Sequence, residues 1–161
     1  MAISTNGTVI ARLAGGLYNS VMSNATYLEV ASQDPSTLAN TLYSRDFAKS
    51  TDLAVATTLI KNIGLSTVAG LDNWVAAQLT AAGAANKGAK IVSLLNDFAG
   101  LSADATWGTY ATAFNTKVDA ALAASQKTGS VEAKFEAAGT VATANATFTL
   151  TANTDSGAAF T

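Results

Sequence analysis

The stretch VAGLDNWVAAQL, residues 68–79, decides the fold class of this chain. A glycine, an acidic residue and a tryptophan open it, and large apolar residues follow at Leu71, Trp74, Val75 and Leu79. This i, i+3, i+4, i+8 spacing is typical of an amphipathic helix that packs one face on a core. After the short loop AAGAANKG the spacing recurs at Ile91, Leu94, Leu95 and Phe98. Residues 67–82 and 87–99 therefore predict a helical hairpin at the centre of an all-α domain, with Trp74 in its core.

Three or four helices are predicted on the amino-terminal side of this hairpin, from apolar residues at helical spacing. The first starts near Asn6 and contains Gly15-Gly16, a pair that disfavours a helix interior and indicates either close packing or a kink. Residues 24–31 either continue this helix or form a short second one. The apolar residues of these two segments are Ile10, Leu13, Leu17, Val21, Tyr27, Leu28 and Val30.

The next two helices have clearer start signals. Asp34 followed by Pro35 is typical of a helix start, because aspartate accepts hydrogen bonds from free amides and proline at the first position loses no needed donor. This helix carries Leu38, Leu42, Tyr43 and Phe47. Asp52 is expected to be the N-cap of the following helix, which ends at Gly64. The residues expected on its inner face are Leu53, Ala56, Leu59, Ile60 and Ile63.

Beyond Gly100 the helical pattern continues to Gly139, where it gives way to a strand-like pattern. Ser102 or Asp104 is expected to cap a long helix that runs to about Lys127, and residues 131–138 form a short amphipathic piece. Residues 139–161 are rich in threonine, and TFTLT at 147–151 alternates with period two, as strands do. We therefore expect an all-α domain of about six or seven short helices over 4–138. The segment 139–161 would be either the first strand of a β-rich region or a linker.

The composition excludes several classes of function. The 161 residues hold neither cysteine nor histidine, so disulfide frameworks, thiolate zinc sites and Ser-His-Asp catalysis are absent. The nine basic residues are scattered singly, which argues against nucleic-acid binding. No apolar run approaches a membrane span, and the amino terminus lacks the pattern of a cleaved signal peptide. Only 12% of the residues are charged, so neutral polar groups are expected to solvate the surface.

Two stretches resemble a known family. GLDNWVAAQL at 70–79 is similar to a helical module found beside calcium-binding RTX repeats in secreted bacterial proteins, and TFTLTANTDS at 147–156 resembles the run into threonine-rich β-repeats. The chain thus resembles the amino-terminal region of type I-secreted surface-layer proteins of Gram-negative bacteria. The resemblance implies an extracellular, cell-surface protein exported without a cleaved signal. It also implies a domain that anchors a self-assembling lattice to lipopolysaccharide O-polysaccharide. No GGxGxD repeat is present, so no cofactor is expected here, and calcium would belong to the parent protein.

Aromatic and charged surface residues are the candidate carbohydrate contacts. Trp107 and Tyr110 come at the start of a helix, where one ring edge could stay exposed. Tyr43 and Arg45 pair an aromatic ring with a charge that could hold sugar hydroxyls; the alternative is an ordinary amphipathic helix surface. The carboxylates are too dispersed to predict a general acid and base pair, so we expect no enzyme and no metal site.

Three functions are compatible with these patterns. The first is a structural surface-layer domain that anchors and assembles the lattice. The second is a spacer or adapter module of a large secreted RTX-type adhesin or enzyme, which predicts no lattice. The third, an intracellular or phage structural scaffold, rests on the missing signal peptide alone.

Overall fold

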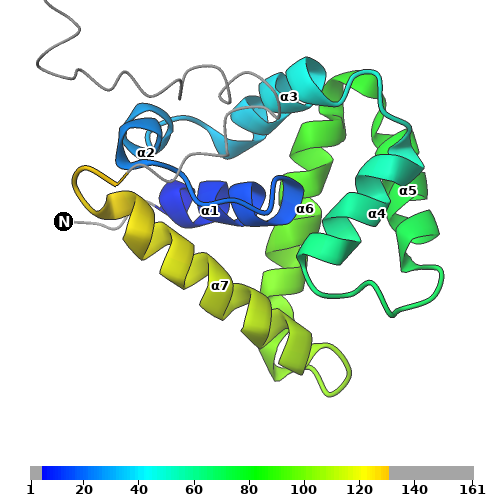
Figure 1. Cartoon of the computed structure of the whole chain (residues 1–161). Helices are drawn as coiled ribbons and strands as arrows, with labels where there is room; N and C mark the ends of the chain where they lie inside the picture. The colour runs from blue at the N-terminus through cyan, green and yellow to red at the C-terminus, as the bar shows by residue number, and fades with distance from the viewer. Residues whose placement is uncertain (1–4, 131–161) are drawn as a thin grey trace, which may run out of the picture.

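The computed structural model describes residues 5–130, and these residues form an all-α domain (Figure 1). The prediction of an all-α bundle of six or seven helices is confirmed for this part of the chain. The expected piece at 131–138 and the expected strand within 139–161 lie outside the described residues. The seven helices are α1 (Thr5–Leu17), α2 (Asn24–Val30), α3 (Pro35–Asp46), α4 (Asp52–Asn62), α5 (Leu71–Ala82), α6 (Lys87–Ala99) and α7 (Gly108–Gln126).

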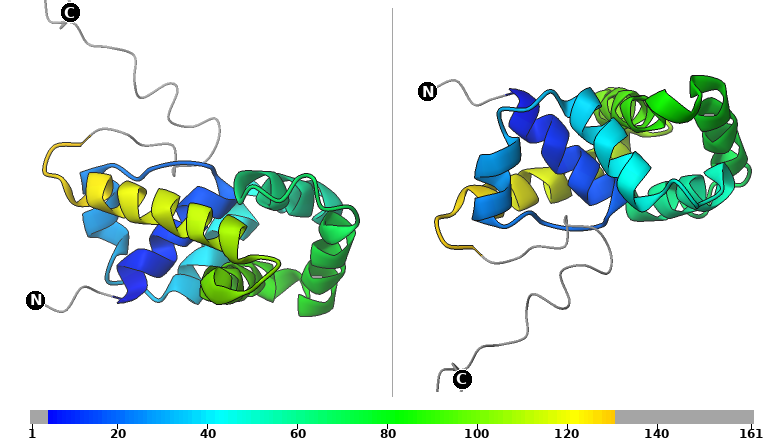
Figure 2. Two further views of the ribbon diagram at one scale, coloured as in Figure 1. Left: turned by 90° about the horizontal axis from the view of Figure 1, so that it is seen from below. Right: turned by 90° about the horizontal axis from the view of Figure 1, so that it is seen from above.

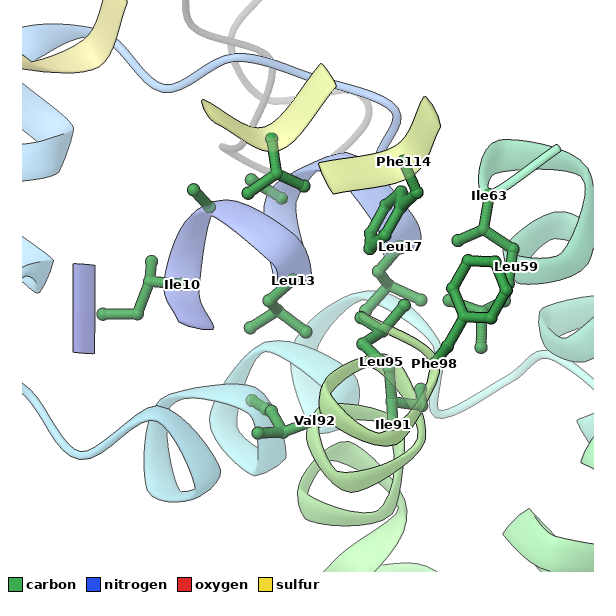
Figure 3. Packing of buried hydrophobic residues seen from close by; sticks show 14 of the residues in the cluster. Ile10, Leu13, Leu17, Leu59, Ile63, Ile91, Val92, Leu95, Phe98 and Phe114 are labelled. Atoms are coloured by element: carbon green, nitrogen blue, oxygen red, sulfur yellow. The ribbon is translucent and has the colours of Figure 1, made fainter. Parts of the chain in front are cut away.

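Helix α6 lies at the centre of the bundle. It contacts α1, α3, α5 and α7, and two short 3₁₀ turns, η1 (Ala84–Asn86) and η2 (Gly100–Ala103), flank it. Figure 3 shows Ile91 and Leu95 of α6 lying beneath Leu13 and Leu17 of α1. All four side chains are fully buried or nearly so. Because these residues recur at helical spacing in the sequence, the core forms where the two apolar stripes meet.

Two glycines allow helices to approach closely. A Cβ atom on Gly88 of α6 would overlap the carbonyl group of Ala39 on α3. A Cβ atom on Gly16 of α1 would come within 2.7 Å of the Leu95 side chain. Of the two expectations for Gly15-Gly16, close packing is therefore confirmed at Gly16, and α1 continues through both residues.

The start of α3 follows the prediction, whereas that of α4 does not. Asp34 Oδ1 accepts a 2.8 Å hydrogen bond from the Thr37 N–H, directly before Pro35. The N-cap of α4 is Thr51, whose hydroxyl accepts from the Ala54 N–H at 3.2 Å, and the expectation for Asp52 was wrong by one residue. A threonine hydroxyl is also among the favoured N-caps. This shift leaves the Asp52 carboxylate free to reach other helices.

Other boundaries differ by a few residues. Helix α5 starts at Leu71 instead of residue 67, because Gly70 adopts a left-handed conformation (φ +79°) that interrupts the helix before it. Helix α7 ends at Gln126, and Asp104 caps the turn before it by accepting from the amides of Thr106 and Trp107. Leu53 was expected to face inward, but it is 44% exposed. Within residues 5–130 no helix is both long and apolar enough to cross a membrane.

We predict that Gly88→Ala destabilises the fold because the new methyl group must push α3 away from α6. The expected loss in the free energy of unfolding is about 3 kcal/mol, at the upper end of overpacking effects. Urea unfolding followed by circular dichroism measures it. Gly100→Ala is the matched control, because Gly100 has a helical φ of −72° and open space around its Cβ position. The control should be neutral or slightly stabilising; equal losses in both variants would refute the close-contact explanation.

Candidate functional site

An open apolar groove with a volume of about 430 Å³ lies on the described domain. Helices α4, α5 and α6 form its walls, and the η2 turn and the segment before α7 close one end. Leu59 of α4, Ile63 directly after α4 and Phe98 of α6, which lie beside one another in Figure 3, are buried lining residues. The volume lies in the range of pockets that bind small molecules or side chains of a partner.

Large apolar side chains surround the mouth of the groove. Leu71 and Trp74 extend from the first turn of α5, and Leu101 and Trp107 lie on the opposite side, on η2 and just before α7. Trp74 is 52% exposed and Leu101 is 36% exposed, whereas Trp107 is half-buried against the core. Trp74 and Leu101 are therefore accessible to a partner, whereas Leu71 and Trp107 are partly covered by the core.

The structure corrects the expectation that Trp74 is a core residue. Val75 and Leu79 on the same stripe are buried as predicted, but Trp74 points to solvent over the groove. The apolar spacing of α5 is the same for a helix that closes a core and for one that borders an open groove. In the motif Gly70-Leu71…Trp74, the left-handed Gly70 begins α5, and Leu71 and Trp74 of its first turn both line the groove.

The groove carries little charge. Asp97 is the single charged residue among its described lining residues, and it is exposed. Within residues 5–130 there is also no cluster of three acidic side chains that could hold a metal ion. An occupant of the groove would therefore gain free energy from apolar contact, at roughly 25 cal/mol for each Å² removed from water, with few directional hydrogen bonds.

Of the four predicted carbohydrate contacts, two lie on α3 and two at the start of α7, and Figure 1 shows these places at opposite sides of the domain. Trp107 lines the groove, and Tyr110, one turn further along, is 38% exposed. Sequence reasoning thus selected Trp107, which lines the groove, without indicating that a groove exists. Their role in carbohydrate binding stays a prediction.

Tyr43 and Arg45 are engaged within the fold. The Tyr43 side chain is 5% exposed, so its ring offers no face to a ligand. Arg45 holds both carboxylate oxygens of Asp46, through Nε at 2.7 Å and Nη2 at 2.8 Å, and this pairing raises the pKa of the guanidinium. Tyr18 donates to the same carboxylate at 2.6 Å; burial, together with that hydrogen bond, raises the pKa of the phenol well above its usual range.

Asp52 lies on α4 and connects this helix to three others through hydrogen bonds. Its carboxylate on α4 accepts from Lys87 Nζ of α6 at 2.5 Å, from the Thr80 hydroxyl of α5 at 2.7 Å and from the Tyr43 hydroxyl of α3 at 3.4 Å. The Lys87 bond is the main cause that lowers the pKa of Asp52 below its usual value of 3.8. Burial, followed by the charge of Asp52, raises the pKa of Tyr43 to about 12. The cluster is therefore a structural tie between helices.

A second, smaller hollow of about 310 Å³ lies between α7 and the segment that follows α1. Lys117 on its wall donates to Asn19 Oδ1 and to the Asn62 carbonyl at the end of α4. Partial burial lowers the pKa of this ammonium group. A cation at a helix carboxyl end stabilises that end. Lys117 therefore stabilises the end of α4 and links it to α7.

Comparison of the sequence with protein-family models and with curated proteins, and of the structure with solved structures, gave no match. The resemblance to surface-layer proteins therefore rests on residues 70–79 and 147–156. Of the first stretch, Leu71 and Trp74 border the groove and Val75 lines its interior.

We predict that the Asp52 tie makes the fold sensitive to acid. A carboxyl group whose folded pKa is lowered stabilises the fold above its unfolded pKa, and this contribution disappears as the pH falls through the folded pKa. Asp52→Asn should therefore lower the free energy of unfolding by about 1–2 kcal/mol at pH 7, as expected for hydrogen bonds to a charged group, and by much less near pH 2. Urea titrations at both pH values measure this difference.

Asp119→Asn on the exposed side of α7 is the matched control, and it should change the free energy of unfolding little at either pH. A loss from Asp52→Asn that is equal at pH 7 and pH 2 would contradict a role for the carboxylate charge.

Proposed function

We propose that this chain is a non-catalytic structural domain of a bacterial surface layer, which self-associates and anchors the layer to lipopolysaccharide O-polysaccharide. The observation that carries the proposal is the open apolar groove. Its rim is built by Leu71 and Trp74, which belong to the stretch that resembles the surface-layer family. The same resemblance supports an extracellular location and export without a cleaved signal.

The chemistry of the groove supports association with protein. A site for a sugar or a polar metabolite needs several convergent polar groups that orient its hydroxyls. The lining here is apolar except for Asp97 at its edge. Contiguous exposed apolar surface with a buried, packed floor is typical of protein interaction sites. We therefore assign self-association to the groove.

The polysaccharide would bind outside the groove. Tyr110 is exposed on the first turn of α7, next to the half-buried Trp107, and aromatic rings of this kind present an apolar face together with a polar edge. The exposed Asp104, whose carboxylate accepts from the Trp107 N–H, lies beside them, so this surface suits a neutral polymer of sugars better than an anionic one. Arg45 contributes less to such a surface because its guanidinium is already paired with Asp46.

We predict that the chain co-sediments with lipopolysaccharide from its own source only when the O-polysaccharide is present. Tyr110→Ala should weaken this binding roughly fivefold, the loss typical of one interface residue that contributes about 1 kcal/mol. Leu28→Ala is the control, because Leu28 is 68% exposed on α2, far from α7's first turn.

Two outcomes would count against the proposal. Equal pelleting with and without the O-polysaccharide would place the contact on another part of lipopolysaccharide. No pelleting with either form, for a chain that also stays monomeric, would overturn the surface-layer function and favour the spacer module.

A further inference from the structure

The apolar groove needs an occupant whose shape and charge match it, and the chain itself contains a segment of this kind. We infer that the groove binds residues 147–151, TFTLT, of a second copy of this chain. The inference rests on the proposed self-association and names the two surfaces that would meet. The supporting observations are the charge of the segment, its apolar pattern and the place from which it leaves the domain.

Charge favours this segment over other parts of the chain. Residues 137–154 carry no charged side chain, between Glu136 and Asp155. Moving a charged group into an apolar groove costs several kcal/mol unless it is paired, and the groove offers only the carboxylate of Asp97 at its edge. An uncharged segment enters without this cost.

The spacing of the apolar residues in the segment suits an apolar groove that takes up side chains from one face of an extended chain. Phe148 and Leu150 are two residues apart, and in an extended chain residues i and i+2 point to the same face. Both side chains could enter the groove together, while the three threonines face outward or along the rim. Extended segments with alternating side chains are a recurring way in which peptides bind preformed surfaces.

The direction of the chain favours a second copy. Ser130, the last described residue, is held at α2, where its carbonyl and hydroxyl accept from the Asn24 N–H at 3.2 and 3.0 Å. In Figures 1 and 2 α2 lies at one end of the domain and α5, which borders the groove, at the other. The chain therefore continues toward the segment from the end of the domain opposite its own groove.

The length of chain between the two points is sufficient for exchange between neighbours. Sixteen residues, 131–146, separate Ser130 from the segment and reach roughly 55 Å at most. A copy placed end to end would present its groove within that reach. Because donor and acceptor lie at different ends, the contact is head to tail, and such contacts either close into rings or continue as open arrays.

Intrinsic fluorescence offers a direct readout. The sequence contains two tryptophans, and both Trp74 and Trp107 line the groove. The entry of Phe148 and Leu150 would remove water from both rings and shift their emission to shorter wavelength. We therefore expect the emission maximum of the full chain to move to the blue as the protein concentration rises, in step with association measured by sedimentation velocity.

Two variants of the full 161-residue chain test the inference. Trp74→Glu blocks the groove at a side chain that is half exposed, and Phe148→Ser with Leu150→Ser removes the apolar contacts of the segment. Each should weaken self-association at least roughly tenfold, the loss expected for a central interface residue. Leu28→Glu, at the exposed site on α2, should stay within twofold of the wild type.

The decisive measurement mixes the two variants. The Trp74→Glu chain keeps a working segment and the serine variant keeps a working groove, so an equimolar mixture should form a one-to-one complex and nothing larger. Circular dichroism of each variant before mixing checks that it is folded. A complex restored on mixing supports exchange between copies.

Three results would overturn the inference. The first is a wild-type chain that stays monomeric up to the highest concentration tested. The second is association that neither variant weakens, and the third is a pair of variants that fails to recover on mixing. In the latter two cases the proposed self-association would survive with a different interface, and lipopolysaccharide binding would be untouched in all three.

Discussion

The contact between the backbone of α3 and the first turn of α6 is the constraint on which the rest of the structure depends. Gly88 has no side chain, so the carbonyl group of Ala39 lies directly against α6. The amide of Ala89, one of the donors that a helix start leaves without an internal partner, is satisfied by Asn40 Oδ1 at 2.8 Å. Steric fit and a hydrogen bond thus fix α6 at the same point, and α1 and α7 pack along its remaining length.

The groove follows from how α5 is attached to this frame. Thr80 near the end of α5 and Lys87 at the start of α6 both bind Asp52, which holds the two helices together beside the turn that joins them. Toward the opposite end of the hairpin α5 and α6 separate, and the first turn of α5 borders the groove (Figure 1). Trp74 stays exposed, and Leu71 is only partly buried, because a polar tie closes only one end of the hairpin.

The helices could be predicted from the sequence, but the surface that they leave open could not. Periodic apolar residues identify a helix and its inner stripe, and the residues of α6 behave as predicted because that helix is enclosed by four others. The stripe of α5 has the same spacing, yet it divides between a buried part at Val75 and Leu79 and an open part at Trp74. Which part is covered depends on the position of α4, and no local pattern encodes that. Arg45 shows the same limit, because it pairs with the adjacent Asp46, whose carboxylate also accepts from Tyr18, the residue directly after α1.

An open apolar groove makes a protein with so few charges prone to self-association. Charged side chains make up only 12% of the sequence, so repulsion between like charges does little to keep copies apart. Exposed tryptophan and leucine at one site then favour association, and a head-to-tail contact would extend it into rings or open arrays. In a domain that must stay dispersed, such a site would promote aggregation. In a domain whose role is to form an array, the same surface, the low charge and the direction of the chain all favour assembly.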